Sequence, residues 1–285
     1  MGVIEIKGLT KYYGKVKALD DVNLTIEPNK IYGLLGRNGA GKTTLLNLLT
    51  NKIFPTKGDI TIDGHTVFEN DELLGRMFYM TEKNLYPEGL RVKEIFKWTQ
   101  EFYPSFDMDH ANTLCEKFGL NANKRIKNLS TGYKSILKII TALASNADIM
   151  LFDEPVLGLD ANSRDMFYRE LLASYNRHLK TIIISTHLIE EVDEILEEVI
   201  IIKKGRVILT RSLERLLSSA YMVYGQCHKV DQYISNRKYT GEQTMGGFKS
   251  AIVMEDTRDE ALAQKLGLEF GMVELQKLFI ALTNS

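Results

Sequence analysis

Residues 36–44 combine three glycines with a lysine and two threonines, a composition suited to binding phosphate groups. Glycines lack the Cβ atom that would block a backbone wrapped around phosphate oxygens, and successive backbone N–H groups then form an anion site. In such a loop, Lys42 is expected to reach the β- and γ-phosphates of a nucleotide, and the Thr43 hydroxyl is expected to ligate Mg²⁺. The residues expected to bind the nucleotide are Gly36, Arg37, Asn38, Gly39, Ala40, Gly41, Lys42, Thr43 and Thr44.

Two adjacent carboxylates, Asp153 and Glu154, follow the four apolar residues 149–152. At the end of a strand, the aspartate can hold Mg²⁺ through water, and the glutamate can orient and deprotonate an attacking water. His187, which ends the next apolar run, could hydrogen-bond the γ-phosphate region and fix that water. Neither pattern is specific alone. Together with the glycine-rich loop they predict nucleotide hydrolysis, with Lys42, Glu154 and His187 as the catalytic residues.

Tyr13 lies before the glycine-rich loop and next to a turn at Gly14. An aromatic ring placed there could stack on a purine, with a contribution of about 1–3 kcal/mol. Ordinary packing within a sheet is the alternative, and the local pattern alone favours it. The phosphate- and metal-binding patterns elsewhere in the chain reverse that preference, so we expect Tyr13 to contact the base.

The strands and helices that must position these residues follow from the apolar periodicity. Ile31–Leu35 is typical of a strand and Leu45–Thr50 of a helix, so the glycine-rich loop joins the two as phosphate binding requires. Further buried strands are expected at residues 148–152 and 181–185. Strands that alternate with helices, with the chemistry at their carboxyl ends, predict an α/β doubly wound sheet.

Other segments differ from this alternation. Val3–Lys7 and Val22–Glu27 alternate apolar and polar residues as strands do. Helices expected at Val92–Phe102 and Asp109–Phe118 follow one another without an intervening strand, which predicts a helical insert. Trp98 within that insert could contact a partner protein, and packing inside the insert is the alternative.

From about residue 212 the pattern changes to short strands and helices. The elements expected there are a helix at Ser212–Ser218, strands at Met222–Tyr224, Tyr239–Thr244 and Ala251–Met254, and helices at Asp259–Leu266 and Val273–Leu282. This pattern predicts a small α+β domain after the main one.

The composition excludes several classes of protein. The 36 basic and 37 acidic residues give a net charge of -1, so the chain offers no overall field for nucleic acid or anionic lipid. Cys115 and Cys227 lie far apart and outside any metal-binding or redox spacing, which fits packing roles in a reducing cytosol. No apolar run approaches the roughly 18 residues that a membrane span needs. We expect a soluble protein that reaches a membrane only through a partner.

About residues 3–210 resemble the nucleotide-binding subunit of an ABC transporter, with the family's motifs in the family's order. The glycine-rich loop matches its Walker A motif, and the pair Asp153 and Glu154 matches its Walker B motif. Tyr13 lies at the position of the A-loop aromatic and Glu82 at the Q-loop position. The segment Leu129–Tyr133 matches the signature motif. Farther along, Gly158-Leu-Asp matches the D-loop and His187 the switch histidine.

The resemblance implies a P-loop NTPase fold of the ABC type. This fold has a mostly parallel core sheet, an antiparallel β subdomain and a helical insert near residues 83–135. The ABC domain would span residues 1–211, and an accessory α+β domain would span residues 212–285. ATP and Mg²⁺ are the implied cofactors, with Thr43, Glu82 and Asp153 as the metal ligands.

The resemblance also implies partners. Two such domains would face head to tail, formed by this chain with itself or with a related ATPase subunit. Ser130 and Gly132 of one domain would then contact the ATP held by the other domain's phosphate-binding loop, and Asp160 of the D-loop is also expected to bind the nucleotide. Transmembrane permease subunits would hold the protein at the cytoplasmic face of the cell membrane, and no nucleic acid is implied.

Two departures from the family pattern bear on activity. Thr131 and Tyr133 replace the usual Gly and Gln of the signature motif, while Ser130 and Gly132 are retained. Glu82 replaces the usual Gln, and its carboxylate would add a negative charge near the phosphates. The C-terminal extension resembles that of ABC-2-type exporter ATPases for antibiotics, lipids and hydrophobic peptides, and most of all the group that exports phenol-soluble modulins.

Two other functions remain as alternatives. A soluble ABC ATPase acting on ribosomes or DNA is disfavoured because no second glycine-rich loop, long heptad pattern or basic excess occurs. A sensor that binds ATP without turnover would be expected to lack the glutamate after the Walker B aspartate, and Glu154 is present.

Overall fold

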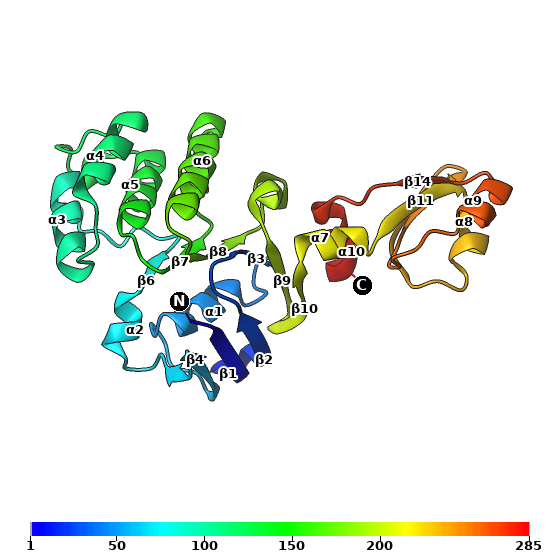
Figure 1. Cartoon of the computed structure of the whole chain (residues 1–285), viewed down its shortest axis with the longest axis horizontal. Coiled ribbons are helices and arrows are strands. Elements are labelled where there is room, and N and C mark those ends of the chain that lie inside the picture. Colours follow the sequence, from blue (N-terminus) through cyan, green and yellow to red (C-terminus); the bar gives the residue numbers. More distant parts are fainter. Residues whose placement is uncertain (1, 285) are drawn as a thin grey trace.

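A six-stranded sheet forms the centre of the computed structural model, which describes residues 2–284 (Figure 1). Its strand order is β10-β9-β3-β8-β7-β6, and the strands from β9 to β6 run parallel, while β10 is antiparallel. The strands are β3 (Ile31–Leu35), β6 (Met77–Met80), β7 (Ile149–Asp153), β8 (Thr181–Thr186), β9 (Glu198–Lys203) and β10 (Arg206–Ser212). Every residue of β3, β7 and β8 is buried, as in a parallel sheet covered on both faces. The predicted α/β sheet is confirmed.

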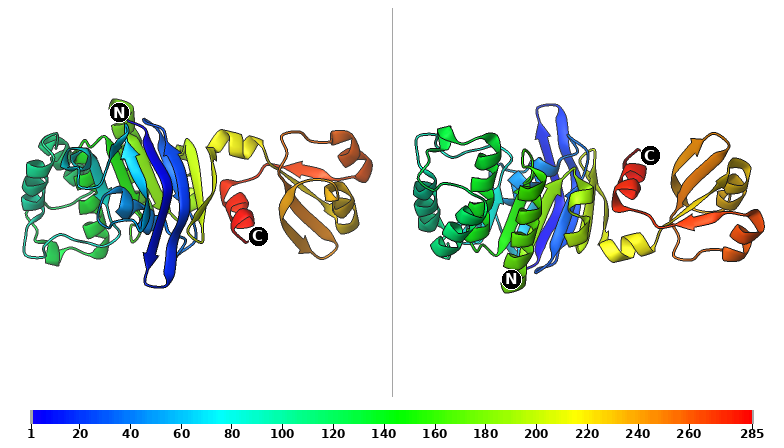
Figure 2. Two further views of the ribbon diagram at one scale, coloured as in Figure 1. Left: turned by 90° about the horizontal axis from the view of Figure 1, so that it is seen from below. Right: turned by 90° about the horizontal axis from the view of Figure 1, so that it is seen from above.

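An antiparallel sheet of order β2-β1-β4-β5 covers one face of the central sheet (Figure 2). Its strands are β1 (Ile4–Tyr13), β2 (Val16–Ile26), β4 (Lys57–Ile62) and β5 (His65–Thr66). Its apolar residues, those of the central sheet and those of α1 (Lys42–Leu49) form one core. The prediction that the first strand ends at Lys7 was wrong. The register of β1 shifts after Ile6 and again after Leu9, which disrupts the alternation of buried residues without ending the strand.

Helices α3 (Val92–Phe102), α4 (Met108–Lys117) and α5 (Thr131–Ala144) group at one end of the molecule (Figure 1). The bounds of α3 are those predicted, and α4 begins and ends one residue earlier than predicted. Helix α6 (Ala161–Arg177) lies beside this group, and α2 (Asp71–Gly75) precedes β6. The buried faces of α3–α6 share one core with the central sheet.

The C-terminal part contains a second antiparallel sheet of order β12-β13-β11-β14, at the opposite end of the molecule (Figure 2). Its elements are α7 (Leu213–Ser218), β11 (Tyr221–Gln226), α8 (Cys227–Ile234), β12 (Tyr239–Met245), β13 (Phe248–Val253), α9 (Glu260–Leu266), β14 (Glu269–Gly271) and α10 (Leu275–Asn284). Sequence reasoning missed α8, a short helix whose preceding residue, Gln226, makes no side-chain cap. Val230 and Tyr233 of α8 lie in a separate apolar core of this domain.

The last helix, α10, lies between the small sheet and the central sheet (Figure 2). Leu278 and Phe279 belong to the same apolar core as Val192, which follows the 3₁₀ helix η2 (Ile189–Glu191). The Arg37 guanidinium donates a hydrogen bond to the Asn284 side chain, with Nη1 and Oδ1 3.0 Å apart. The C-terminal part of the chain therefore contacts the rest of the molecule beside the glycine-rich loop.

No helix in residues 2–284 has both the length and the apolar character required to cross a bilayer.

Candidate functional site

One cavity of about 630 Å³ at the carboxyl ends of the central strands gathers most of the residues predicted to do chemistry. Its lining includes Tyr13, the loop of residues 37–44, Glu82, Asp153, Glu154 and His187. These residues come from the ends of β1 and β7 and from the segments that follow β3, β6, β7 and β8. The parallel pairing of β3, β6, β7 and β8 places their carboxyl ends at the same edge of the sheet.

The glycine-rich loop between β3 and α1 requires two of its glycines for steric reasons. Gly41 has φ +113°, and a Cβ atom there would lie 2.7 Å from the Ala18 carbonyl oxygen. A Cβ atom on Gly36 would lie 2.7 Å from the Ile202 carbonyl oxygen. The Lys42 ammonium group donates to the Gly36 carbonyl oxygen at 2.6 Å and spans the loop. Burial lowers the pKa of Lys42, and the nearby carboxylates of Glu154 and Asp153 oppose that shift.

Asp153 is almost fully buried at the end of β7, and three hydroxyl groups donate to its carboxylate. The donors are Thr43 Oγ1 at 2.7 Å, Ser185 Oγ at 2.9 Å and Tyr79 OH at 3.3 Å. Ser185 and Tyr79 lie on β8 and β6, which flank β7, so they reach Asp153 from both sides. Sequence reasoning missed these two residues because it did not establish which strands are neighbours.

Oxygen atoms of Thr43, Glu82 and Asp153 lie around the same cavity, and hydroxyl and carboxylate oxygens suit a hard cation such as Mg²⁺. In residues 2–284 no group of three or more His, Cys, Asp and Glu side chains is arranged to hold a metal. A cation here would therefore complete its shell with phosphate and water oxygens, which is the usual way for proteins to bind Mg²⁺.

Glu154 and His187 contact each other, with Glu154 Oε2 and His187 Nδ1 2.9 Å apart. The Thr186 hydroxyl donates to the same carboxylate oxygen at 3.2 Å. The Glu154 backbone has φ +51°, a left-handed conformation that is uncommon for a residue other than glycine. Its N–H donates to the Ser185 carbonyl at 2.8 Å, which secures this turn and directs the carboxylate toward His187.

Tyr13 is the last residue of β1, and 48% of its surface is exposed. Tyr13 lines the same cavity, with the Lys11 ammonium group 5.4 Å from its ring centroid. Tyr13 therefore lies outside the apolar cores, which disfavours the packing alternative.

Ser130, Gly132 and Asp160 do not line this cavity. Ser130 caps α5, and its Oγ accepts a hydrogen bond from the Tyr133 N–H at 3.3 Å. Asp160 caps α6, and its carboxylate accepts from the Ser163 N–H at 2.8 Å. Hydrogen bonds from the Ser163 N–H and hydroxyl groups lower the pKa of Asp160. The predicted residues therefore form two separate groups in one chain. One group lines the cavity, and the other, Ser130, Gly132 and Asp160, lies at the starts of α5 and α6.

A family model described as ABC transporter matches residues 19–157. The ABC transporter ATP-binding protein NatA of Bacillus subtilis is 37% identical over 212 residues, which cover 72% of this chain and 85% of NatA. This chain belongs to the ABC transporter ATP-binding proteins.

Two further relatives of this ABC protein are informative. The bacitracin transport ATP-binding protein BcrA of Bacillus licheniformis is 29% identical over 260 residues, which cover 90% of this chain and 80% of BcrA. The dimeric post-hydrolysis structure of the ATP-binding cassette MJ0796 bound to ADP and Pi has a TM-score of 0.65 and 25% identity. That match covers 74% of this chain and 98% of the cassette.

Family membership establishes the fold and the reaction. The predicted P-loop NTPase fold of the ABC type is confirmed. ABC ATP-binding domains hydrolyse ATP, so this protein is the ATP-hydrolysing subunit of an ABC transporter. The alternative of an ATP sensor without turnover is thereby disfavoured.

Proposed function

We propose that this ABC ATPase drives export of a hydrophobic or amphipathic substrate through separate transmembrane permease subunits. The substrate would be a peptide, an antibiotic or a lipid, and exporters of phenol-soluble modulins are the subgroup that we favour. The similarity to BcrA, a bacitracin transport protein, supports this class because it extends over 90% of the chain. Such an arrangement would place the protein at the cytoplasmic face of the cell membrane.

A groove on the helical end of the molecule carries the proposal of a permease partner. Its volume is about 660 Å³, and its lining combines residues of α2, β6 and α3. Trp98 and Phe102 of α3 line it and remain 48% and 75% exposed. Exposed aromatic side chains at the rim of an apolar groove are typical of a protein interface. We infer that a short cytoplasmic helix of the permease occupies this groove, which favours the interface over the packing alternative for Trp98.

Within the nucleotide cavity we assign roles according to the geometry. The Tyr13 ring stacks on the adenine, while Lys42 and the backbone N–H groups of residues 37–44 bind the phosphates. Glu154 orients and deprotonates the attacking water, and His187 holds the Glu154 carboxylate and the γ-phosphate region in place.

The metal would be held by Thr43, Asp153 and Glu82. Mg²⁺ supplies charge neutralisation of the phosphates when it is bound. The hydroxyl groups of Tyr79 and Ser185 keep the Asp153 carboxylate oriented toward the cavity.

We propose that Ser130, Gly132 and Asp160 act on the ATP of a second ATPase subunit, arranged head to tail. This explains why they lie outside the cavity of their own chain. The N–H groups at the start of α5 suit an anion such as the γ-phosphate. In this scheme residues 1–211 form the ABC domain, with its helical insert near residues 83–135, and residues 212–285 form the accessory domain.

Transport by reconstituted vesicles tests the proposal. The tagged chain is purified from native membranes, the transmembrane protein that accompanies it is identified, and both are placed in inverted vesicles with labelled amphipathic peptide, bacitracin and lipid. ATP-dependent uptake of one of these substrates is the expected result. Vesicles that hold the complex, hydrolyse ATP and accumulate none of them would contradict the export proposal.

The groove is tested with Trp98→Glu. A carboxylate in an apolar interface should abolish transport and co-purification of the permease, while basal ATPase activity stays within about twofold because Trp98 lies outside the nucleotide cavity. Phe248→Glu is the matched control, since Phe248 is 64% exposed on the accessory domain and outside the groove. Equal loss of ATPase and transport in Trp98→Glu would assign Trp98 to the fold instead.

A further inference from the structure

Lys138 is a lysine inside the core of the helical end. It lies on α5, and only 7% of its surface is exposed. Its neighbours in the helix, Leu137, Ile139 and Ile140, are apolar and buried. Burying a charged side chain in such surroundings costs free energy unless acceptors receive its hydrogen bonds. The acceptors of the Lys138 ammonium group therefore indicate its role.

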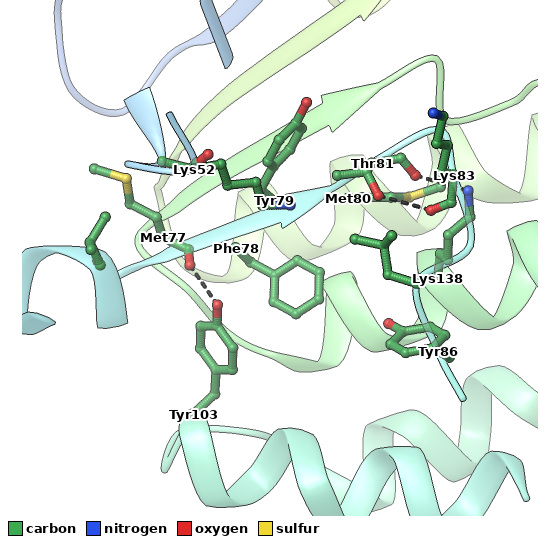
Figure 3. Close-up of a pocket in the computed structure, with 13 residues that line it drawn as sticks. Lys52, Met77, Phe78, Tyr79, Met80, Thr81, Lys83, Tyr86, Tyr103 and Lys138 are labelled. Atoms are coloured by element: carbon green, nitrogen blue, oxygen red, sulfur yellow. Dashed lines mark hydrogen bonds between the residues drawn. The ribbon is translucent and has the colours of Figure 1, made fainter. Parts of the chain in front are cut away.

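The Lys138 ammonium group donates to two consecutive carbonyl oxygens in the loop after β6. The distances are 2.9 Å to the Thr81 oxygen and 2.6 Å to the Glu82 oxygen. Figure 3 shows the Lys138 side chain reaching from α5 toward the loop that carries Thr81 and Lys83. Burial lowers the pKa of Lys138 to about 8, and the charges of Glu82 and Asp153 oppose that shift.

The two ends of this contact belong to the two separate groups of functional residues. Glu82 lines the nucleotide cavity, whereas α5 begins at the cap residue Ser130. Lys138 lies eight residues after Ser130, which is about 12 Å along a helix. Within residues 2–284, Lys138 is the side chain that donates to the backbone of both Thr81 and Glu82.

The contact also lies beside the proposed permease groove. Lys138 lines a cavity of about 360 Å³ together with Phe78, Tyr86 and Tyr103 (Figure 3). The same three aromatic residues line the groove that contains Trp98. A segment inserted into the groove would press on side chains that surround the Lys138 contact.

We propose that Lys138 is a positioning residue that ties the Glu82 loop to the signature helix α5, so that the two groups of ATPase residues move as one body when a permease segment docks. The permease part of this inference rests on the proposed function. The hydrogen bonds from Lys138 to the loop lie within this chain and do not depend on a permease. Lys138 does not line the nucleotide cavity, so it acts on the reaction through the Glu82 backbone.

Steady-state ATPase kinetics of the full chain, without a permease, test whether Lys138 positions the Glu82 loop. Lys138→Met keeps an unbranched side chain that is one atom shorter and removes both hydrogen bonds. The expected result is a kcat about tenfold lower with a KM for ATP within about twofold of the wild type. The nucleotide-binding groups are intact, and only the alignment needed for hydrolysis is lost. Hydrogen exchange should become faster in residues 81–90 and remain unchanged in α6.

Lys180→Met is the matched control. Lys180 is equally buried, with 3% of its surface exposed, and donates to the Ser174 hydroxyl at 3.0 Å, outside the nucleotide cavity. Both variants should lose thermal stability to a similar extent, but Lys180→Met should keep the wild-type kcat. If Lys138→Met does not fold, Lys138→Gln, whose side chain is uncharged and one atom shorter than that of lysine, replaces it with the same expected effects on kcat and KM.

Three outcomes would overturn the proposal. They are an unchanged kcat in a Lys138 variant, an equal fall of kcat in Lys180→Met, and unaltered exchange in residues 81–90. Where the permease is present, the Lys138 variant should also lose stimulation of ATPase activity by the permease. Absence of stimulation in the wild type would count against the proposed function. The kinetics of the isolated chain would still test whether Lys138 positions the Glu82 loop.

Discussion

The nucleotide cavity and the starts of α5 and α6 carry functional residues in contrasting ways. In the cavity, Asp153 and Glu154 each receive hydrogen bonds from side chains of a neighbouring strand or its end, so several elements fix each group. At the helix starts, Ser130 and Asp160 accept a backbone N–H of their own helix. The first region is assembled by several elements of one chain, whereas the second presents the exposed cap residues of two helices. This difference is the basis of our proposal that the second region completes its site with another chain.

The largest expected effect lies in the cavity. Glu154→Gln should bind ATP but lower kcat by about 10²–10⁴-fold, because the amide keeps the shape of the side chain and cannot accept the water's proton. ATPase assays and ATP-dependent dimerisation measure the two properties, and a trapped ATP-bound dimer is expected. Glu190→Gln, at an exposed position after the switch histidine, is the control and should behave as the wild type. Turnover within a few-fold of the wild type would show that Glu154 is not the base.

The division between the two regions is tested by mixing two inactive variants. Lys42→Ala removes the cation that binds the phosphates, and Gly132→Asp places a carboxylate where an anion must bind. In a head-to-tail dimer of one chain with itself, a mixed pair carries both lesions in one site and none in the other. ATPase activity and ATP-dependent dimerisation should therefore recover on mixing, with a maximum near equal amounts.

The mixing experiment has an informative opposite result. If each site were complete within one chain, every mixed dimer would contain two damaged sites, and no ratio would restore activity. A flat response, with heterodimers confirmed by mass spectrometry, would remove the head-to-tail arrangement and the contrast between the two regions.

The smallest expected effect concerns Tyr13 at the rim of the cavity. Tyr13→Ala should weaken ATP binding by about 1–3 kcal/mol, which appears mainly in KM because stacking is present in both the ground and the transition state. Tyr12→Ala is the control, because Tyr12 is 39% exposed and lies outside the cavity. Nucleotide titration measures both, and equal affinities for Tyr13→Ala and the wild type would contradict stacking.

Elements with a regular period were predictable. The bounds of α3 and β3 agree with the prediction because each segment has an uninterrupted apolar period and a clear end. The continuation of β1 to Tyr13 was not predictable, since register shifts disrupt the alternation on which the prediction depended. Helix α8 was missed because a short helix without a side-chain cap leaves little local signal.

Local spacing was sufficient to predict the glycine-rich loop, the carboxylate pair and the ATPase reaction, because each motif is contiguous and its own residues impose its backbone geometry. The strand order decided the rest. Tyr79 and Ser185 reach Asp153 only because β6 and β8 pair with β7, and Lys138 reaches Glu82 across 56 residues of sequence. Such contacts depend on which elements become neighbours on folding, and that is determined by burial of the whole apolar surface rather than by any local pattern.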